Sequence, residues 1–310
     1  MKRRFSVIIA TYNYEKYVKR AIDSVLSQTF QDYEVIVVDD GSTDRTSEAL
    51  KSYGEKIRAI RQVNQGSEMA YKTGASFAIG EYLVFLDSDD LFLPWTLATY
   101  DDIIQNFCLP PVIIGSMFYF SDEGDIQGIV RNVDAIKVLK YRDYLSKGIS
   151  IGLSQSRIII QKSIFDEANI LMEKVTEPFL LNDYNLMLIA GTYGPCIIIQ
   201  QPITVAYRQH SAQGSKKVEK MAKGVLALIN ALTTGPYSQS SRRTSKYAYV
   251  GGLVFEWSGK ALKTHQQGLA LRLLIKGAPM LAAAVAKKIW NTLFWRSSPI
   301  TIKVERANLS

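Results

Sequence analysis

The chain has 310 residues, and 47% of them are apolar, so it can bury the core of one large domain with or without an appendage. Residues 1–215 carry 21 basic and 26 acidic residues, whereas residues 216–310 carry 16 basic and 3 acidic ones. This asymmetry predicts an anionic partner for the basic half, either nucleic acid or the cytoplasmic face of a membrane. We see no secretory signal and no uninterrupted apolar stretch of roughly 18 residues, which predicts a cytoplasmic chain that is not an integral membrane protein.

The two cysteines carry no recognisable chemistry. Cys108 and Cys196 lie beside or within apolar runs, and neither has a second metal-ligating residue at close spacing. We therefore expect both to be small buried core residues of a protein in a reducing compartment.

The first 110 residues alternate between apolar runs typical of buried strands and segments with helical periodicity. Strands separated by helices predict a doubly wound, mainly parallel α/β sheet with flanking helices. Ligands of such sheets bind beyond the carboxyl ends of the strands. The expected strands are 5–10, 34–40, 57–62 and 82–87, and the expected helices are 15–28, 43–54 and a third that Ser67 caps and Gly80 ends.

Polar clusters follow three of these strands. They are Thr11-Tyr12-Asn13, Asp39-Asp40-Gly41 and Asp87-Ser88-Asp89-Asp90. One such cluster could arise by chance, but three at the same edge of a sheet are much less expected by chance. Three carboxylates within four positions are costly without a positive partner, and a divalent cation, which takes oxygen ligands and keeps phosphate as a co-ligand, meets that need. The pattern predicts a metal-diphosphate site and a nucleotide-linked substrate.

The order of elements is less regular after residue 110. We expect a first domain over 1–215 and a helical, basic region over 216–310. Large aromatics interleaved with basic residues on its last helix suit a membrane interface. The expected elements are strands at 112–120, 126–131, 157–161 and 196–200, helices at 134–146, 183–190, 216–232, 240–263, 266–276 and 279–295, and a mobile loop at 210–215.

Five stretches together resemble the family 2 inverting glycosyltransferases, which have the GT-A fold. They are F-S-V-I-I-A-T-Y-N-Y at 5–14, V-I-V-V-D-D-G-S-T-D at 35–44, N-Q-G at 64–66, G-E-Y-L-V-F-L-D-S-D-D at 80–90 and Y-R-Q-H at 207–210. The resemblance implies a nucleoside-diphosphate sugar donor (we expect a UDP-sugar), Mn²⁺ or Mg²⁺, and inversion at the anomeric carbon. By analogy with relatives that have such tails, it also implies a glycan or lipid-linked acceptor in bacterial envelope polysaccharide assembly.

The resemblance assigns roles to the acidic cluster. Asp89 ligates the metal, with His210 as a further ligand, while Asp87 meets the donor ribose or the water shell of the metal. Ser88 belongs to the same donor site, and Asp90 is expected to be a structural cap. The alternative is that these acids only begin a helix and accept from its backbone donors.

The same resemblance implies a nucleotide pocket in which Asp40 accepts from the edge of the base and Asp39 is structural. The reverse assignment stays open, because neighbouring residues on a strand point to opposite faces. Lys72 stands, beside Tyr71, where many relatives carry Arg and Asn, so donor identity is open. The implied donor-binding residues are Thr11, Tyr12, Asn13, Asp40, Gly41, Lys72, Asp87, Ser88 and Arg208, the last as a phosphate partner.

Inverting transfer needs a carboxylate that takes the proton of the acceptor hydroxyl. Relatives use an acidic pair at a helix start, and this chain has Asn182-Asp183 there, so Asp183 is the expected base. A helix N-terminus would keep Asp183 ionised. The alternatives are that Asp183 is only a helix cap, or that Glu177 is the base.

Two other functions remain open. A degenerate, non-catalytic binding protein is one, because Asn182 and Lys72 depart from the family pattern. A sugar-nucleotide nucleotidyltransferase is the other, although the Gly-rich phosphate loop it needs after the first strand is absent. The basic region has no recognition motif for bases, so we expect no nucleic acid and a peripheral site at the inner membrane face.

Overall fold

The computed structural model describes residues 3–122, 124–127, 129, 135–147, 152–173, 181–210, 217–238, 242–294 and 300–303. The strands are β1 (Arg3–Thr11), β2 (Tyr33–Asp39), β3 (Arg58–Arg61), β4 (Gly80–Asp87), β5 (Leu91–Phe92), β6 (Val112–Ile114), β7 (Met117–Phe120), β8 (Ala135–Tyr141), β9 (Ile158–Gln161), β10 (Cys196–Gln201), β11 (Val205–Arg208) and β12 (Ile300–Lys303). The helices are α1 (Val18–Leu26), α2 (Thr46–Lys51), α3 (Ser67–Phe77), α4 (Thr96–Asn106), α5 (Gly124–Gln127), α6 (Lys162–Met172), α7 (Asn182–Ile189), α8 (Val218–Thr233), α9 (Arg243–Lys263) and α10 (Gln267–Phe294). Short 3₁₀ turns are η1 (Gly54–Lys56), η2 (Tyr144–Lys147), η3 (Gln155–Arg157) and η4 (Ala190–Thr192).

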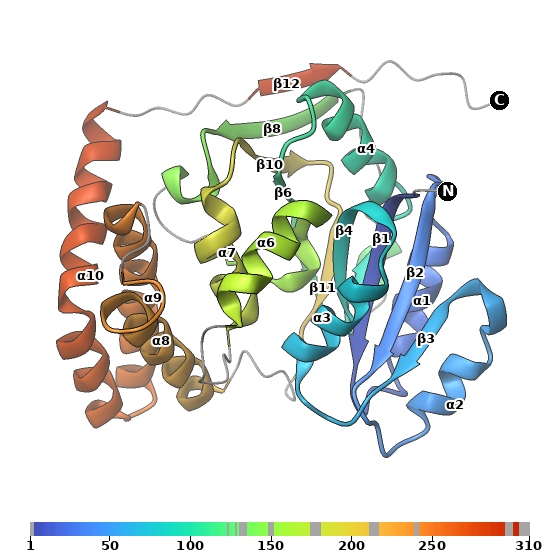
Figure 1. Ribbon diagram of the computed structural model, residues 1–310, viewed down its shortest axis with the longest axis horizontal. Coiled ribbons are helices and arrows are strands. Elements are labelled where there is room, and N and C mark those ends of the chain that lie inside the picture. The colour runs from blue at the N-terminus through green and yellow to red at the C-terminus, as the bar shows by residue number, and fades with distance from the viewer. Residues whose placement is uncertain are drawn as a thin grey trace.

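The described strands form a nine-stranded sheet in the order β12-β8-β10-β6-β9-β4-β1-β2-β3 and a three-stranded sheet, β5-β11-β7 (Figure 1). Strands β1 to β4 run parallel, and β9 is antiparallel to both of its neighbours. The expected α/β architecture with a large, mainly parallel sheet and flanking helices is therefore confirmed.

Both faces of the large sheet are covered, which explains its continuous apolar strands. Because neighbouring residues alternate between faces, Val7 packs with α1, α2 and α4 while Ile8 packs with α3, α6 and the C-terminal helices. The apolar face of α1, formed by Val18, Ala21, Ile22 and Val25, is buried, and Leu26 is partly buried. In register, Thr11 lies beside Asp39 and Ala10 beside Asp87, so the polar strand ends meet at one edge.

The region 112–147 differs from the expectation. A helix at 134–146 is wrong, because 135–141 is strand β8, antiparallel between β10 and β12. Its apolar residues alternate, with Ile136 and Val138 buried and Lys137 and Lys140 exposed. The expected strand 112–120 divides into β6 and β7 of different sheets, and residues 124–127 are helix α5, which includes the start of the strand expected at 126–131. Of the expected strand 126–131, residues 128, 130 and 131 lie outside the described residues.

Three smaller expectations are also corrected. Gly66 at φ +90°, not Ser67, is the N-cap of α3, and no side chain caps that helix. Gly80 opens β4, where Ser6 and Phe5 leave no room for a Cβ. Cys196 is buried as expected, but Cys108 is exposed because it follows α4 in a left-handed conformation with φ +54°.

The expected break between helices 266–276 and 279–295 is absent, and Pro279 lies inside the single helix α10. A proline in a helix removes one backbone hydrogen bond, so packing must offset that loss. Gly277 lies so close to α9 that a Cβ there would be 2.6 Å from Val254 Cγ2. An 18-residue stretch within residues 267–291 has a mean hydropathy of 1.7, so α10 is long and apolar enough to cross a membrane by length and composition alone, although Arg272 and Lys276 interrupt its apolar run.

Candidate active site

A cavity of about 690 Å³ opens at the carboxyl ends of β1 and β4. Its walls include Thr11, Asp40, Asp87 and Asp89 from the strand ends, together with Asp183 from α7. The starts of α3 and α7 close one side, and residues of α8 and α9 close another. The structure thus gathers most of the predicted site residues around one cavity.

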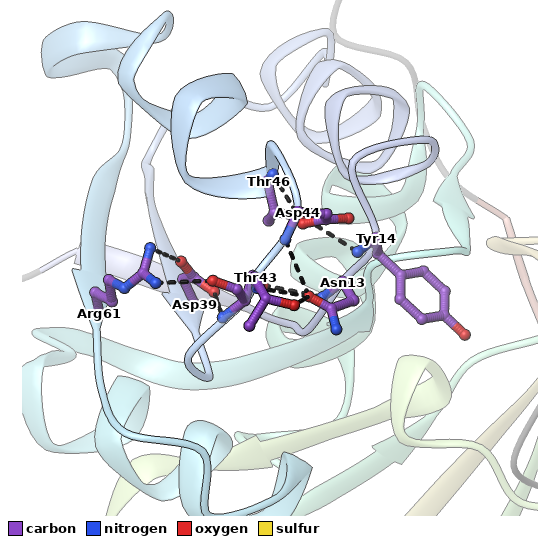
Figure 2. Close-up of polar contacts among 8 residues, drawn as sticks. Asn13, Tyr14, Asp39, Thr43, Asp44, Thr46 and Arg61 are labelled. Atoms are coloured by element: carbon purple, nitrogen blue, oxygen red, sulfur yellow. Dashed lines mark hydrogen bonds and ion pairs between the residues drawn. The ribbon is translucent and has the colours of Figure 1, made fainter.

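The loop after β1 is fastened to the loop after β2 (Figure 2). Asn13, in a left-handed conformation with φ 54°, accepts from Thr43 N at 2.7 Å and from Asp44 N at 3.3 Å through Oδ1. Its own N–H donates to Ser42 Oγ. Tyr14 N donates to Thr46 Oγ1, and the Tyr14 ring projects away from this network. The Asn13 carbonyl oxygen therefore shapes the pocket loops, and its contact with a donor stays a prediction.

Asp39 and Asp40 are both buried and hydrogen-bonded, but to different partners. Asp39 accepts from Ser42 N at 2.8 Å and forms an ion pair with Arg61 at 3.2 Å, as Figure 2 shows. Asp40 lines the cavity and accepts from Gln62 Nε2 and from the N–H groups of 65 and 66, all within 2.9 Å. Asp39 thus holds its own turn, while Asp40 shapes the 62–66 loop beside the cavity.

Gly41 and Lys72 occupy different surroundings. Gly41 has φ +77°, and a Cβ there would lie 2.9 Å from Asn64 N, so the turn requires glycine. Lys72 forms an ion pair with Glu68 at 2.9 Å one helical turn away. A role for Lys72 in binding the donor stays a prediction.

The acidic turn after β4 is anchored by side chains that the sequence motif did not single out. Asp87 Oδ1 accepts from the Tyr71 hydroxyl at 2.7 Å, and Asp87 N donates to Ser156 Oγ at 3.0 Å. The same Ser156 hydroxyl donates to Asp90 Oδ2 at 2.6 Å, and Arg208 N donates to Asp90 Oδ1 at 3.0 Å. Asp90 is therefore a fully buried anchor of the turn rather than a helix cap.

Negative charge is concentrated at this turn. Burial, together with the charge of Asp89, raises the pKa of the Asp87 carboxyl to about 6. Burial and the charges of Asp89 and Asp87 raise the pKa of Asp90 well above its usual range. Tyr14, which was missed from the sequence, lines the cavity, and burial followed by the charges of Asp89 and Asp87 raises its pKa to about 12. A bound cation would reverse these shifts.

Asp89 and His210 are brought together as a pair. His210 Nε2 lies 2.9 Å from Asp89 Oδ2, and its ring stacks on Tyr17 at 5.4 Å. Arg208 Nε donates to Asp89 O at 2.9 Å, and its guanidinium lies over the rings of Tyr17 and Phe120. Arg208 is therefore placed to hold the Asp89 backbone, and a contact of Arg208 with phosphate stays a prediction.

The donor set around Asp89 fits a cation bound mainly by substrate. Within the described residues, no group of three or more His, Cys, Asp or Glu side chains is clustered closely enough to hold a metal ion. Asp89 and His210 offer an oxygen and a nitrogen ligand, whereas Asp87 is engaged by Tyr71 and Ser156. Mn²⁺ or Mg²⁺ sites of this kind keep waters and diphosphate oxygens as the remaining ligands.

Asp183 lies in the first turn of α7 and lines the cavity. Its Oδ1 accepts from Tyr184 N at 2.9 Å, and the N-cap of the helix is Leu181, so Asp183 is not the cap. Burial raises its pKa to about 7, opposed by the Tyr184 hydrogen bond and reinforced by the charge of Asp87. Burial therefore opposes the ionisation that the helix N-terminus was expected to maintain. Asn182 donates to Ser67 Oγ at 3.3 Å, and Glu177 lies outside the described residues.

The C-terminal helices supply a wall of the cavity that no sequence motif indicated. Lys220 and Met221 of α8 and Glu256, Trp257 and Lys260 of α9 line it. Lys260 Nζ lies 3.9 Å from the centre of the Trp257 ring and forms an ion pair with Glu256. The only signal in the sequence was the mixture of aromatic and basic residues on the helix expected at 240–263.

We expect Ser156→Ala to lower the free energy of unfolding by about 1–3 kcal/mol, because a buried carboxyl of Asp90 and the N–H of Asp87 lose their shared partner. Thermal denaturation measures the loss. Ser76→Ala is the matched control, since the exposed Ser76 hydroxyl donates only to a carbonyl of its own helix. Equal melting temperatures for the two variants would contradict this role for Ser156.

Comparisons with known proteins agree with this geometry. The model of glycosyl transferase family 2 matches residues 6–167. An uncharacterized glycosyltransferase of Rickettsia conorii is 32% identical over 219 residues, which are 69% of this chain and 35% of that protein. The uncharacterized glycosyltransferase alr2836 of Nostoc is 43% identical over 106 residues, 33% of each chain. The chain thus spans about a third of the length of these curated relatives.

Solved structures share the fold. TarS 1–349 of S. aureus, in complex with UDP-GlcNAc, superposes with a TM-score of 0.55 at 16% identity, over 94% of this chain and 92% of that one. The mannosyltransferase PcManGT of Pyrobaculum calidifontis, in complex with GDP-Man and Mn²⁺, gives a TM-score of 0.50 at 16% identity, over 94% and 88%. At such identities the likeness establishes the fold.

Proposed function

Because this chain belongs to glycosyltransferase family 2, we propose that it is a metal-dependent, inverting glycosyltransferase that moves a sugar from a nucleoside diphosphate to a hydroxyl group. The observation that carries the proposal is one cavity lined by both Asp89, which His210 contacts, and Asp183. Asp89 and His210 suit the leaving diphosphate, and Asp183 suits the attacking hydroxyl.

The donor lies at the strand-end side of the cavity. Tyr12, 43% exposed, offers its ring to a nucleobase, and the buried Thr11 hydroxyl has no hydrogen-bond partner among the described residues. TarS was solved with UDP and UDP-GlcNAc and PcManGT with GDP-Man, which supports a nucleoside-diphosphate sugar as the class of donor. We propose a UDP-sugar, with Asp40 accepting from the base and Asp87 from the ribose.

The chain's own residues divide the reaction between them. Asp183 takes the proton of the acceptor hydroxyl as that oxygen attacks the anomeric carbon from the face opposite the leaving group. Asp89 and His210 would hold Mn²⁺ or Mg²⁺, which neutralises charge on the departing diphosphate when it is bound. Arg208 keeps the Asp89 backbone in place through its bond to Asp89 O.

The acceptor lies at the side of the cavity formed by α8 and α9, next to Asp183. Lys220 and Lys260 there supply positive charge, which suits a glycan carrying phosphate or a lipid-linked glycan. We place the reaction in envelope polysaccharide assembly, in the cytoplasm and peripherally at the inner face of the membrane. The excess of positive charge in residues 216–310 supports that placement.

A nucleotide panel tests the proposal. UDP-, GDP- and dTDP-sugars are added with and without manganese, and the melting temperature and the release of nucleoside diphosphate are measured. Ligand at about 100 times its Kd adds about 2.7 kcal/mol to the free energy of unfolding, so one nucleotide class raises the melting temperature by several degrees, and more so with manganese. Binding without release would favour the non-catalytic binding protein. If no nucleotide sugar binds and no nucleoside diphosphate is released, the proposal is overturned.

A further inference from the structure

Helix α10 carries a continuous apolar stripe on its solvent-exposed side. At 3.6 residues per turn these side chains fall within a sector of roughly 100° and run for about 27 Å along the helix. Ile275 and Ile289 are 66% and 56% exposed. The members of this α10 stripe, all exposed, are Leu271, Leu274, Ile275, Ala278, Ala282, Val285 and Ile289.

The opposite side of α10 is fixed to the protein. Leu273 and Met280 are fully buried there. Gly277 packs against Val254, and Gly251 of α9 lies against the Met280 carbonyl so closely that neither glycine could carry a Cβ. Figure 1 shows α10 as the outermost helix at its end of the molecule, beyond α8 and α9. The α10 stripe therefore faces outward and is held there rigidly.

Charge decides what covers the stripe. Residues 267–294 contain four basic side chains and no acidic one. By helical position Arg272 and Lys276 lie on one side of the stripe and Lys288 on the other. A second copy of the chain would set these positive charges against one another. Anionic lipid headgroups would neutralise them while the acyl region takes the apolar side chains.

The packing also decides how α10 meets a bilayer. A helix that crosses a membrane needs apolar contact on all sides, and α10 has the length and composition for it. The close contacts at Gly251 and Gly277, however, keep one side of α10 on α9, which carries charged residues such as Glu256 and Lys260. The arrangement is that of a helix lying in the interface plane.

We propose that the α10 stripe is a docking surface for an anionic phospholipid bilayer, on which α10 lies flat with Ile275, Val285 and Ile289 in the acyl region. The surface itself is independent of the reaction. The proposal rests on the proposed function in one respect. A bilayer bound at α10 places a lipid-linked acceptor beside α9, whose Trp257 and Lys260 line the cavity.

Vesicle co-sedimentation of the full chain tests the surface, with phosphatidylcholine vesicles that contain or lack phosphatidylglycerol. We expect binding to the anionic vesicles, weakened about tenfold by each of Ile275→Ser and Ile289→Ser because each removes a large apolar side chain from the interface. Arg272→Gln with Lys276→Gln reduces the preference for phosphatidylglycerol. Ile170→Ser on α6 is the matched control, since Ile170 is 60% exposed on another element and its loss leaves binding unchanged.

Separate readouts keep the outcomes distinct. The thermal shift with a nucleotide donor reports the proposed function and is expected to be the same in every one of these variants. No binding of the unmodified chain to anionic vesicles, or equal binding of Ile275→Ser and Ile289→Ser, overturns the docking surface. An oligomer that these variants dissociate, with vesicle binding unaffected, would overturn it in favour of a second copy of the chain.

Discussion

Asp183→Asn is expected to lower the rate of sugar transfer by about 10³-fold and to leave donor binding unchanged. General-base catalysis contributes about 10²- to 10⁴-fold, and the amide keeps the size of the side chain and its acceptor oxygen for Tyr184 N. Release of nucleoside diphosphate measures the rate, with water as the acceptor where no glycan is supplied, and the donor thermal shift measures binding.

Asn182→Ala is the matched control for this residue. Its amide donates to Ser67 Oγ over a long 3.3 Å, so we expect less than about a threefold change in rate, of the size of a weak exposed hydrogen bond. Full activity of Asp183→Asn, with activity lost instead in Glu177→Gln, would place the base elsewhere.

The pH dependence follows from the same carboxylate. A base must be ionised, and burial raises the pKa of Asp183 to about 7, so the rate falls tenfold per pH unit below that value and levels off above it. The measurement is the rate at saturating donor across pH 5 to 9, with donor binding followed in parallel. A rate that does not change with pH in the wild-type chain would contradict Asp183 as the base. In Asp183→Asn the residual rate should no longer fall tenfold per pH unit below pH 7.

Asp89→Ala is expected to abolish the additional thermal shift that manganese gives with a nucleotide donor and to lower the rate by about 10²–10³-fold. Its carboxylate contacts His210 at 2.9 Å and, in the proposed site, would share a cation with the diphosphate, and one lost electrostatic partner of a transition state costs a factor of this size. The fold should persist, because Asp90 and not Asp89 anchors the turn.

Asp166→Ala is the control for Asp89→Ala, since Asp166 is an exposed carboxylate on α6 whose partner is Lys162 one turn away. Manganese-dependent binding should be unchanged there. A similar loss in both variants would mean a general effect of charge, and an unchanged manganese response in Asp89→Ala would remove Asp89 from the metal site.

The N-terminal half of the fold was predictable mainly because β1, β2 and β4 are buried on both faces and therefore have nearly unbroken apolar runs. β8 was not predictable in that way. Its sequence, with Ile136 and Val138 separated by Lys137, becomes a strand because β10 and β12 pair with it from distant parts of the chain. Pro279 led to the wrong prediction of a break between two helices. The helix continues because the packing of α10 on α9 outweighs the loss of the hydrogen bond that proline removes.

The same distinction applies to the candidate site: residues at strand ends could be predicted, and residues brought in from distant segments could not. Asp40, Asp87 and Asp89 were predictable because parallel strands bring their carboxyl ends to one edge. Ser156 and the cavity wall formed by Trp257 and its neighbours were not, because nothing in their local sequence indicates that folding carries them to that edge. The ionisation of Asp183 depends on burial, which a helix-start motif does not contain.

Helix α9 has a place in the structure that makes it more than a wall. One side of it reaches the cavity through Glu256, Trp257 and Lys260, and another side is locked onto α10 at Gly251 and Val254. A ligand in the cavity contacts α9 directly, and a partner bound to α10 contacts a helix that is packed rigidly against α9. Thermodynamic linkage requires that the factor by which a bilayer alters donor affinity equals the factor by which the donor alters bilayer affinity. With such coupling, and on the proposed docking surface, a change in the concentration of nucleotide sugar would change the fraction of the protein bound to the bilayer.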